Sequence, residues 1–120
     1  MQDFRKLQIW QLSHELTLKL YKVVSSFPDS EKYNLTSQIK RSASSIPANI
    51  AEGCGRKTNG ELEHFLYIAM GSASELEYHL LLSKDLGIID TNLHSELEND
   101  IIILRKKMNV FIQRVSAKRK

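Results

Sequence analysis

The segment from Gln38 to Glu77 contains two helical apolar patterns that meet at the short sequence Gly53-Cys54-Gly55. In each pattern, apolar side chains recur every three or four residues, which is the spacing of one face of an α-helix. The apolar positions are Leu35, Ile39, Ala43, Ile46 and Ile50 before the glycines, and Leu62, Leu66, Ala69, Ala73, Leu76 and Leu80 after them. A chain with this segment is constrained to place two helices side by side, joined by a tight connection.

Small and polar side chains form a second face on each of these two predicted helices. The polar face contains Gln38, Arg41, Ser45, Asn49 and Glu52 in the first helix, and Ser72, Glu75 and His79 in the second. One hypothesis is a half-buried hydrogen-bond network that holds the register of the two helices or of two subunits. The other makes Arg41 and Asn49 ligand contacts. We favour the structural network, because the carboxylates of Glu52 and Glu75 would repel phosphate.

Apolar periodicity predicts one further helix on each side of this segment. The apolar positions are Ile9, Leu12, Leu16, Leu20, Val23 and Phe27 in the first helix, and Leu93, Leu97, Ile101, Leu104, Met108, Phe111 and Val115 in the last. They predict helices over about residues 5–26 and 91–116, the first of which ends before Pro28. The alternating four- and three-residue steps of the last helix are typical of shallow, left-handed packing in a bundle.

The second helix is expected over about residues 30–54, because Asp29 and Ser30 are good N-cap residues. Pro47 lies inside this helix, lacks an amide donor and crowds the carbonyl group four residues earlier, at a cost of about 3 kcal/mol in an ordinary helix. The apolar spacing continues in phase on both sides of the proline, and the serines just before it can bond exposed carbonyl groups. We therefore expect a kink near Pro47 and not a break.

The third helix is expected over about residues 59–86. Thr58 and Glu61 have the spacing of a capping box, in which each side chain bonds to the backbone of the other residue. Gly87 is suited to the left-handed cap that ends a helix. The pair Asp90-Thr91 then supplies the N-cap of the fourth helix.

These four predicted helices assign the chain to the all-α class as one domain, residues 1–120. A chain of 120 residues with 42% hydrophobic content is large enough for one core. Short connections make consecutive helices antiparallel neighbours. We therefore expect a left-handed, antiparallel four-helix bundle with up-down-up-down topology.

Charge is sorted into blocks along the chain. The net charge is +3, but residues 1–60 carry nine basic and five acidic groups, residues 61–100 carry one and nine, and residues 105–120 carry seven basic groups and no acidic one. The basic blocks can attract phosphate, and the acidic block can attract a basic surface of a neighbour. The plainer interpretation is a set of solvated helix faces and a basic tail that favours solubility.

The residues offer little for catalysis or metal binding. The four histidines have no metal-ligand spacing with one another or with Cys54, the only cysteine. No Ser, His and acid constellation can be assigned, and Gly53-Cys54-Gly55 lacks the Lys-Ser/Thr continuation of a phosphate-binding loop. We expect a protein that is not an enzyme and that has no catalytic residue, metal or cofactor.

The single cysteine excludes an internal disulfide and agrees with a reducing compartment. The first ten residues contain no apolar signal region, and no apolar run approaches the ~20 residues of a membrane span. We expect a cytoplasmic protein without membrane contact.

The sequence SIPANIAEG at residues 45–53, with FL at 65–66, IA at 68–69, GS at 71–72 and EL at 75–76, resembles the 23S rRNA intervening-sequence protein family. The resemblance extends to Phe4, Leu7, Trp10, Phe27, Pro28, Glu31, Leu35, Gln38 and Ile39. It implies a bacterial up-down-up-down four-helix bundle assembled as a homopentamer. A related member, the accessory variability determinant protein of diversity-generating retroelements, is a basic pentamer that binds nucleic acid and a reverse transcriptase.

Our first functional hypothesis is a non-enzymatic, oligomeric protein that binds RNA or DNA, or an accessory factor of a ribonucleoprotein. Basic side chains would contact the phosphate backbone without reading sequence. The candidates are Arg5, Lys6, Lys40, Arg41, Arg56, Lys57, Arg105, Lys106, Lys107, Arg114, Lys118, Arg119 and Lys120. The alternative is a protein–protein interaction scaffold without direct nucleic-acid contact, which the charge blocks fit equally well.

Overall fold

The computed structural model describes residues 2–118, and within this range the chain is helical without any strand. The four long helices are α1 (Gln8–Val24), α2 (Leu35–Cys54), α3 (Asn59–Asp85) and α4 (Thr91–Lys118). Two short 3-10 helices, η1 (Phe4–Lys6) and η2 (Asp29–Glu31), precede α1 and α2. The predicted all-α four-helix class is confirmed.

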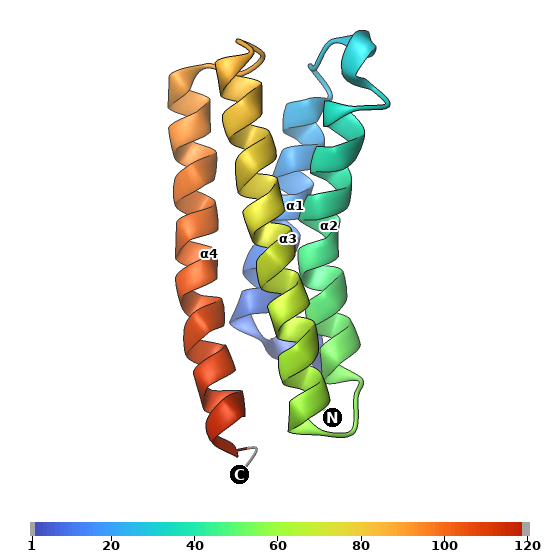
Figure 1. Ribbon diagram of the computed structural model, residues 1–120, viewed down its shortest axis with the longest axis vertical. Coiled ribbons are helices and arrows are strands. Elements are labelled where there is room, and N and C mark those ends of the chain that lie inside the picture. The colour runs from blue at the N-terminus through green and yellow to red at the C-terminus, as the bar shows by residue number, and fades with distance from the viewer. Residues whose placement is uncertain (1, 119–120) are drawn as a thin grey trace.

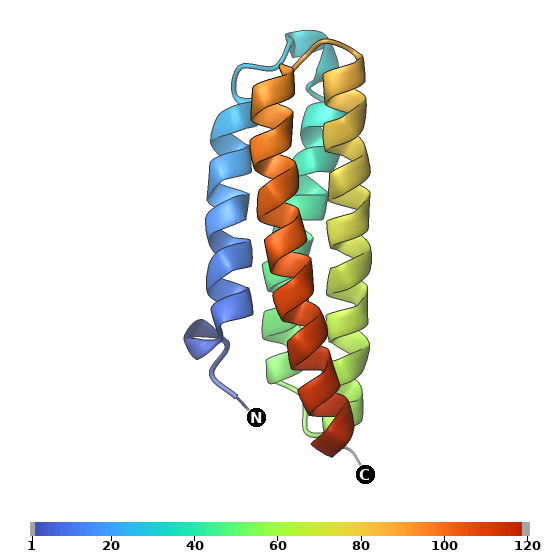
Figure 2. The same ribbon diagram turned by 90° about the vertical axis from the view of Figure 1, so that its left-hand side faces the viewer.

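Consecutive helices run in opposite directions and lie side by side in an elongated bundle of 48 × 23 × 20 Å (Figure 1). This alternation places η1, the α2–α3 connection and the last turns of α4 at one end of the bundle, which we call the terminal end (Figure 2). The opposite end, the loop end, holds η2 and the α3–α4 connection. Residues far apart in the sequence therefore meet at the terminal end.

The core consists of aliphatic side chains from all four helices. The largest fully buried ones are Leu20, Ile39, Ile46, Ile50, Leu66, Leu76, Leu80, Leu97, Ile101, Leu104 and Met108. Ala43 of α2 and Ala69 and Ala73 of α3 are also buried. Near the end of α4, Ile112 is buried and Phe111 only partly so, because the apolar stripe of that helix drifts by one residue there.

The second helix begins later than the sequence pattern predicts. Asp29–Glu31 forms the separate helix η2, in which the amide of Glu31 donates to the carbonyl of Pro28 at 2.9 Å. Asn34 then has φ −121° and ψ −102°, which is not helical, so α2 starts only at Leu35. Similarly, Leu7 is extended, and it separates η1 from α1.

The helix α2 continues through the buried Pro47. Because proline has no amide, the carbonyl group of Ala43 loses its usual partner four residues later. The hydroxyl group of Thr17 in α1 lies 3.1 Å from this oxygen and 2.8 Å from the carbonyl oxygen of Ser13, so its proton is shared between the two. The buried carbonyl group of Ala43 therefore accepts a hydrogen bond from the neighbouring helix α1. The sequence alone points to the serines before Pro47 as the donors. The kink stays a prediction.

The helix ends follow local sequence rules. The hydroxyl oxygen of Thr58 accepts from the amide of Glu61 at 3.1 Å, while the Glu61 carboxylate accepts from that hydroxyl group, at 3.2 Å, rather than from the backbone. At Gly87, where φ is +76°, the amide of Ile88 donates to the carbonyl oxygen of Ser83 at 2.8 Å, which closes α3. Asp90 accepts from the amide of Leu93 and begins α4.

Candidate nucleic-acid interface and polar network

Basic side chains from three separate segments lie at the terminal end of the bundle. Arg5 and Lys6 belong to η1, Arg56 and Lys57 to the α2–α3 connection, and Lys118 to the end of α4. All five are exposed. They meet here because the up-down order brings the start of α1 and the ends of α2 and α4 to the same end (Figure 2).

A groove opens between the start of α1 and the last turns of α4, with a volume of about 400 Å³. We call it the basic groove, and its lining residues are Lys6, Leu7, Gln8, Ile9, Lys106, Lys107, Val110, Phe111 and Arg114. Four of the nine are cationic and none is acidic. Sequence reasoning identified these cations but missed the groove, because its two walls are about 100 residues apart in the chain.

Some of the basic residues predicted to contact phosphate are paired with an acidic side chain of the same chain. Arg105 Nη2 lies 2.9 Å from Glu77 Oε1 of α3, on the side of α4 away from the groove. Arg56 Nη2 lies 3.1 Å from Glu52 Oε2, and its guanidinium group covers the ring of Phe65. Arg5 is paired with Asp3 at 3.5 Å. These three cations are partly neutralised.

Lys40 and Arg41 lie away from the terminal end, in the half of α2 near the loop end (Figure 1). The ammonium group of Lys40 is 5.1 Å from the ring centroid of Tyr21, and both residues line a shallow hollow with Lys32. These cations therefore form a second, separate group. Arg119 and Lys120 lie outside the described residues.

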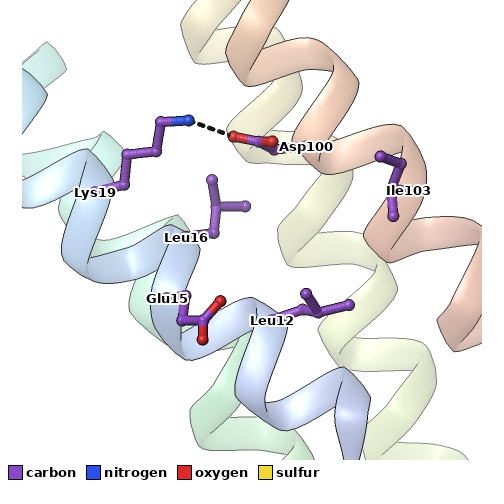
Figure 3. A pocket seen from close by; sticks show the side chains of 6 residues that line it. All are labelled: Leu12, Glu15, Leu16, Lys19, Asp100 and Ile103. Atoms are coloured by element: carbon purple, nitrogen blue, oxygen red, sulfur yellow. Dashed lines mark hydrogen bonds and ion pairs between the residues drawn. The ribbon is translucent and has the colours of Figure 1, made fainter.

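Above the basic groove, toward the loop end, α1 and α4 are joined by ion pairs. Lys19 Nζ lies 2.8 Å from Asp100 Oδ2 (Figure 3) and also contacts Glu96. Its hydrogen bonds to Asp100 and Glu96 raise the pKa of Lys19 above its ordinary value of 10.5. Lys19 and Asp100, with Leu12, Glu15, Leu16 and Ile103, line a hollow of about 260 Å³. This cluster joins residues about 80 positions apart, so no local pattern in the sequence predicts it.

The predicted polar network divides into two groups in the structure. In the first group, Ser45 Oγ and Ser72 Oγ are 2.8 Å apart, and the amide group of Asn49 donates to the carbonyl oxygen and the hydroxyl oxygen of Ser45. This group connects α2 and α3. Glu52 does not join it, because its carboxylate pairs with Arg56 of the α2–α3 connection.

The second group contains Arg41, Glu75 and His79. Glu75 Oε2 is 3.2 Å from His79 Nε2 and 3.9 Å from Arg41 Nη2. The Arg41 side chain is 70% exposed, so this pair is largely screened by water. Gln38 lies beside His79 in a hollow of about 300 Å³. The arrangement fits a register-holding role better than a phosphate site.

Cys54 is buried at the end of α2, and burial raises the pKa of its thiol above the ordinary value. A protonated thiol is a weak nucleophile, so the residue fits a packing role. Within residues 2–118, no cluster of three or more His, Cys, Asp or Glu side chains has the arrangement of a metal site. In the same range, no helix combines the length and the apolar character needed to cross a membrane.

Comparison with solved structures gives a close match in fold. A protein of unknown function from the S23 ribosomal protein family of Bacteroides thetaiotaomicron superimposes with a TM-score of 0.78 at 26% sequence identity. The match covers 87% of this chain and 97% of that one. Among curated proteins, no significant match was found.

The family comparison confirms the resemblance seen in the sequence. The family model described as 23S rRNA-intervening sequence protein matches residues 5–110, which is most of the chain and includes α1, α2, α3 and most of α4. The chain therefore belongs to the 23S rRNA-intervening sequence protein family.

Proposed function

We propose that this protein is a non-enzymatic nucleic-acid-binding protein whose terminal end contacts the phosphate backbone of RNA or DNA. The observation that carries the proposal is the placement of basic side chains from η1, the α2–α3 connection and α4 at one end of the bundle. Lysine and arginine side chains bind phosphates of any sequence and release counterions. A role as an accessory factor of a ribonucleoprotein would follow.

Replacing Lys106, Lys107 and Lys118 together by glutamine tests this proposal. Binding of mixed-sequence RNA and DNA, followed by fluorescence anisotropy from ~50 mM salt upward, should weaken and become less salt-dependent. The matched control replaces Lys22, Lys32 and Lys84, which lie toward the loop end, by glutamine. This triple variant loses the same charge. Equal effects of the two triple variants, or no binding by the wild type at ~50 mM salt, would refute the proposal.

We further propose that the protein is a homo-oligomer, with a pentamer as the expected form from the resemblance. Apolar side chains that the monomer leaves exposed support it: Tyr67 and Tyr78 of α3 are each 57% exposed, and Leu18 of α1 is 54% exposed. Repetition of the basic end by symmetry would supply avidity for a long polyanion. Light scattering should give about five times the monomer mass of 13.8 kDa, and a monomer mass at micromolar concentration would contradict it.

A protein–protein interaction scaffold is the second candidate, and the exposed tyrosines of α3 favour it. Such a scaffold would bind a protein partner, of which a reverse transcriptase is the example implied by the related retroelement protein. Co-purification from native cells separates the candidates, because material bound through phosphate contacts is released steeply by salt. A bound protein that resists salt, without any nucleic acid, would support the scaffold.

A further inference from the structure

We propose that the basic groove binds an unpaired stretch of nucleic acid, with a base placed against its apolar floor, so that the protein prefers single strands to duplexes. This inference rests on the proposed function. It adds a substrate class that phosphate contacts alone do not specify, because phosphates are present in both forms.

The cations of the groove are available to a ligand. Lys6, Lys106, Lys107 and Arg114 have no ion-pair partner among residues 2–118, in contrast with Arg5, Arg56 and Arg105. No acidic side chain lines the groove. The unpaired cations therefore complement a polyanion.

The floor of the groove is apolar, although binding a phosphate group does not need an apolar surface. Leu7, which precedes α1, and Ile9 of α1 line the groove together with Val110 and Phe111 of α4, and Val110 is 48% exposed. A duplex presents its phosphates outward and keeps the faces of its bases stacked inside, so it would leave this floor uncovered. An unstacked base has two apolar faces and can cover it, as in other single-strand grooves that combine cations with apolar or aromatic platforms.

The spacing along α4 places cations on both sides of the floor. Lys107 and Arg114 are seven residues apart, about 10 Å along the helix axis, and Val110 and Phe111 lie between them. This order of cation, apolar surface and cation matches a base flanked by two phosphates.

Acidic side chains limit the groove on one side. Beyond Ile103, toward the loop end, the α1–α4 surface carries Glu15 and Asp100, and Asp100 pairs with Lys19 (Figure 3). Glu96 also contacts Lys19. These carboxylates disfavour phosphate, so a bound strand would run from the groove toward the terminal end. There the exposed Lys57 and Lys118 continue the positive surface. This extension beyond the groove favours a long polyanion over a short acidic peptide.

Anisotropy with a labelled single strand of about 20 nucleotides and with the same strand in a duplex, at one salt concentration, tests the inference. The wild type should bind the single strand about tenfold more tightly. Val110→Ser should remove most of this difference and leave duplex binding unchanged. Ile102→Ser is the matched control, because Ile102 is an exposed apolar residue of α4 outside the groove and its replacement should have no effect.

The outcomes separate this inference from the proposed function. Equal binding of both forms, or equal effects of the two serine variants, would overturn the inference and leave the proposed function standing. Failure to bind either form would overturn both. A further arm compares two competitors at equal total charge, polyglutamate and the unlabelled single strand. If both displace the labelled strand equally well, the groove recognises charge alone and the inference is overturned. Thermal melting checks that both variants stay folded.

Discussion

The α2–α3 interface and the α1–α4 interface use the same kind of helix but pack very differently. Between α2 and α3, small side chains allow close approach: Ala43, Ala69 and Ala73 are buried, and Ser45 bonds Ser72 directly. Between α1 and α4, contact is the least extensive of the neighbouring helix pairs, and two hollows of about 260 and 400 Å³ separate the helices along their length.

The difference shows how a four-helix bundle divides its tasks. Around Ser45 and Ser72, close packing of α2 against α3 leaves no room for a ligand, so this stretch of the interface holds the fold together. The α1–α4 interface is held by an ion pair over part of its length and is open over the rest, which leaves apolar and cationic surface available. The family sequence SIPANIAEG lies in the α2–α3 interface. Helix packing is therefore sufficient to explain its residues, without a functional site.

The largest expected effect comes from filling the tight interface at Gly53. A Cβ atom there would lie 2.9 Å from Leu62 Cδ1 and 3.0 Å from Phe65 Cβ. Gly53→Val should therefore lower the free energy of unfolding by about 3 kcal/mol, measured by chemical denaturation. Gly71→Val is the control, because a Cβ there would have no described atom within 4 Å, and it should be close to neutral. Similar losses in both variants would remove the distinction between packed and open positions.

The next effect is expected at Thr17, which bonds the carbonyl group that Pro47 leaves free. Thr17→Val keeps the shape but removes the hydroxyl group, so the buried oxygen of Ala43 loses its cross-helix partner. The free energy of unfolding should fall by about 2 kcal/mol. Thr17→Ser retains the hydroxyl group and should lose much less. If valine is tolerated as well as serine, α2 does not depend on this bond.

A smaller effect is expected in the contact between Ser45 and Ser72. A double-mutant cycle with Ser45→Ala and Ser72→Ala should give a coupling energy of about 1 kcal/mol. The variants should unfold at lower denaturant concentration and keep their helical circular dichroism. Strictly additive losses would show that the 2.8 Å contact contributes nothing to the pairing of the two helices.

The smallest effect is expected at Lys19, which bridges the open interface. Lys19→Gln should lower the free energy of unfolding by only about 0.5 kcal/mol, because the pair is partly exposed and screened by water. Folding raises the pKa of Lys19, so its contribution is full below its ordinary pKa of 10.5 and is lost as the pH rises beyond that value. Denaturation of the variant and the wild type should therefore converge at high pH. Lys22→Gln, on the same helix, removes the same charge and should leave the free energy of unfolding nearly unchanged, because Lys22 has no ion-pair partner among residues 2–118.

Much of the fold follows from local sequence patterns. The four helices were predictable because apolar residues recur at helical spacing. Several of their ends were predictable because the capping bonds at Thr58, Gly87 and Asp90 join atoms only three to five residues apart. The start of α2 was not predictable, because Asp29 and Ser30 belong to the 3-10 helix η2 and the non-helical Asn34 delays α2 to Leu35. The basic residues were visible in the sequence, but their grouping into the terminal end and a separate group at Lys40 was not.

The sequence by itself determined that this chain forms four amphipathic helices with short connections, since helical period and capping are properties of neighbouring residues. Only the tertiary structure decided which cations remain without an acidic partner, where the α1–α4 groove opens, and that Thr17 bonds Ala43. The physical reason is that these features depend on the distance between side chains on different helices. Helix packing sets that distance, and it cannot be predicted from the spacing of residues along the chain.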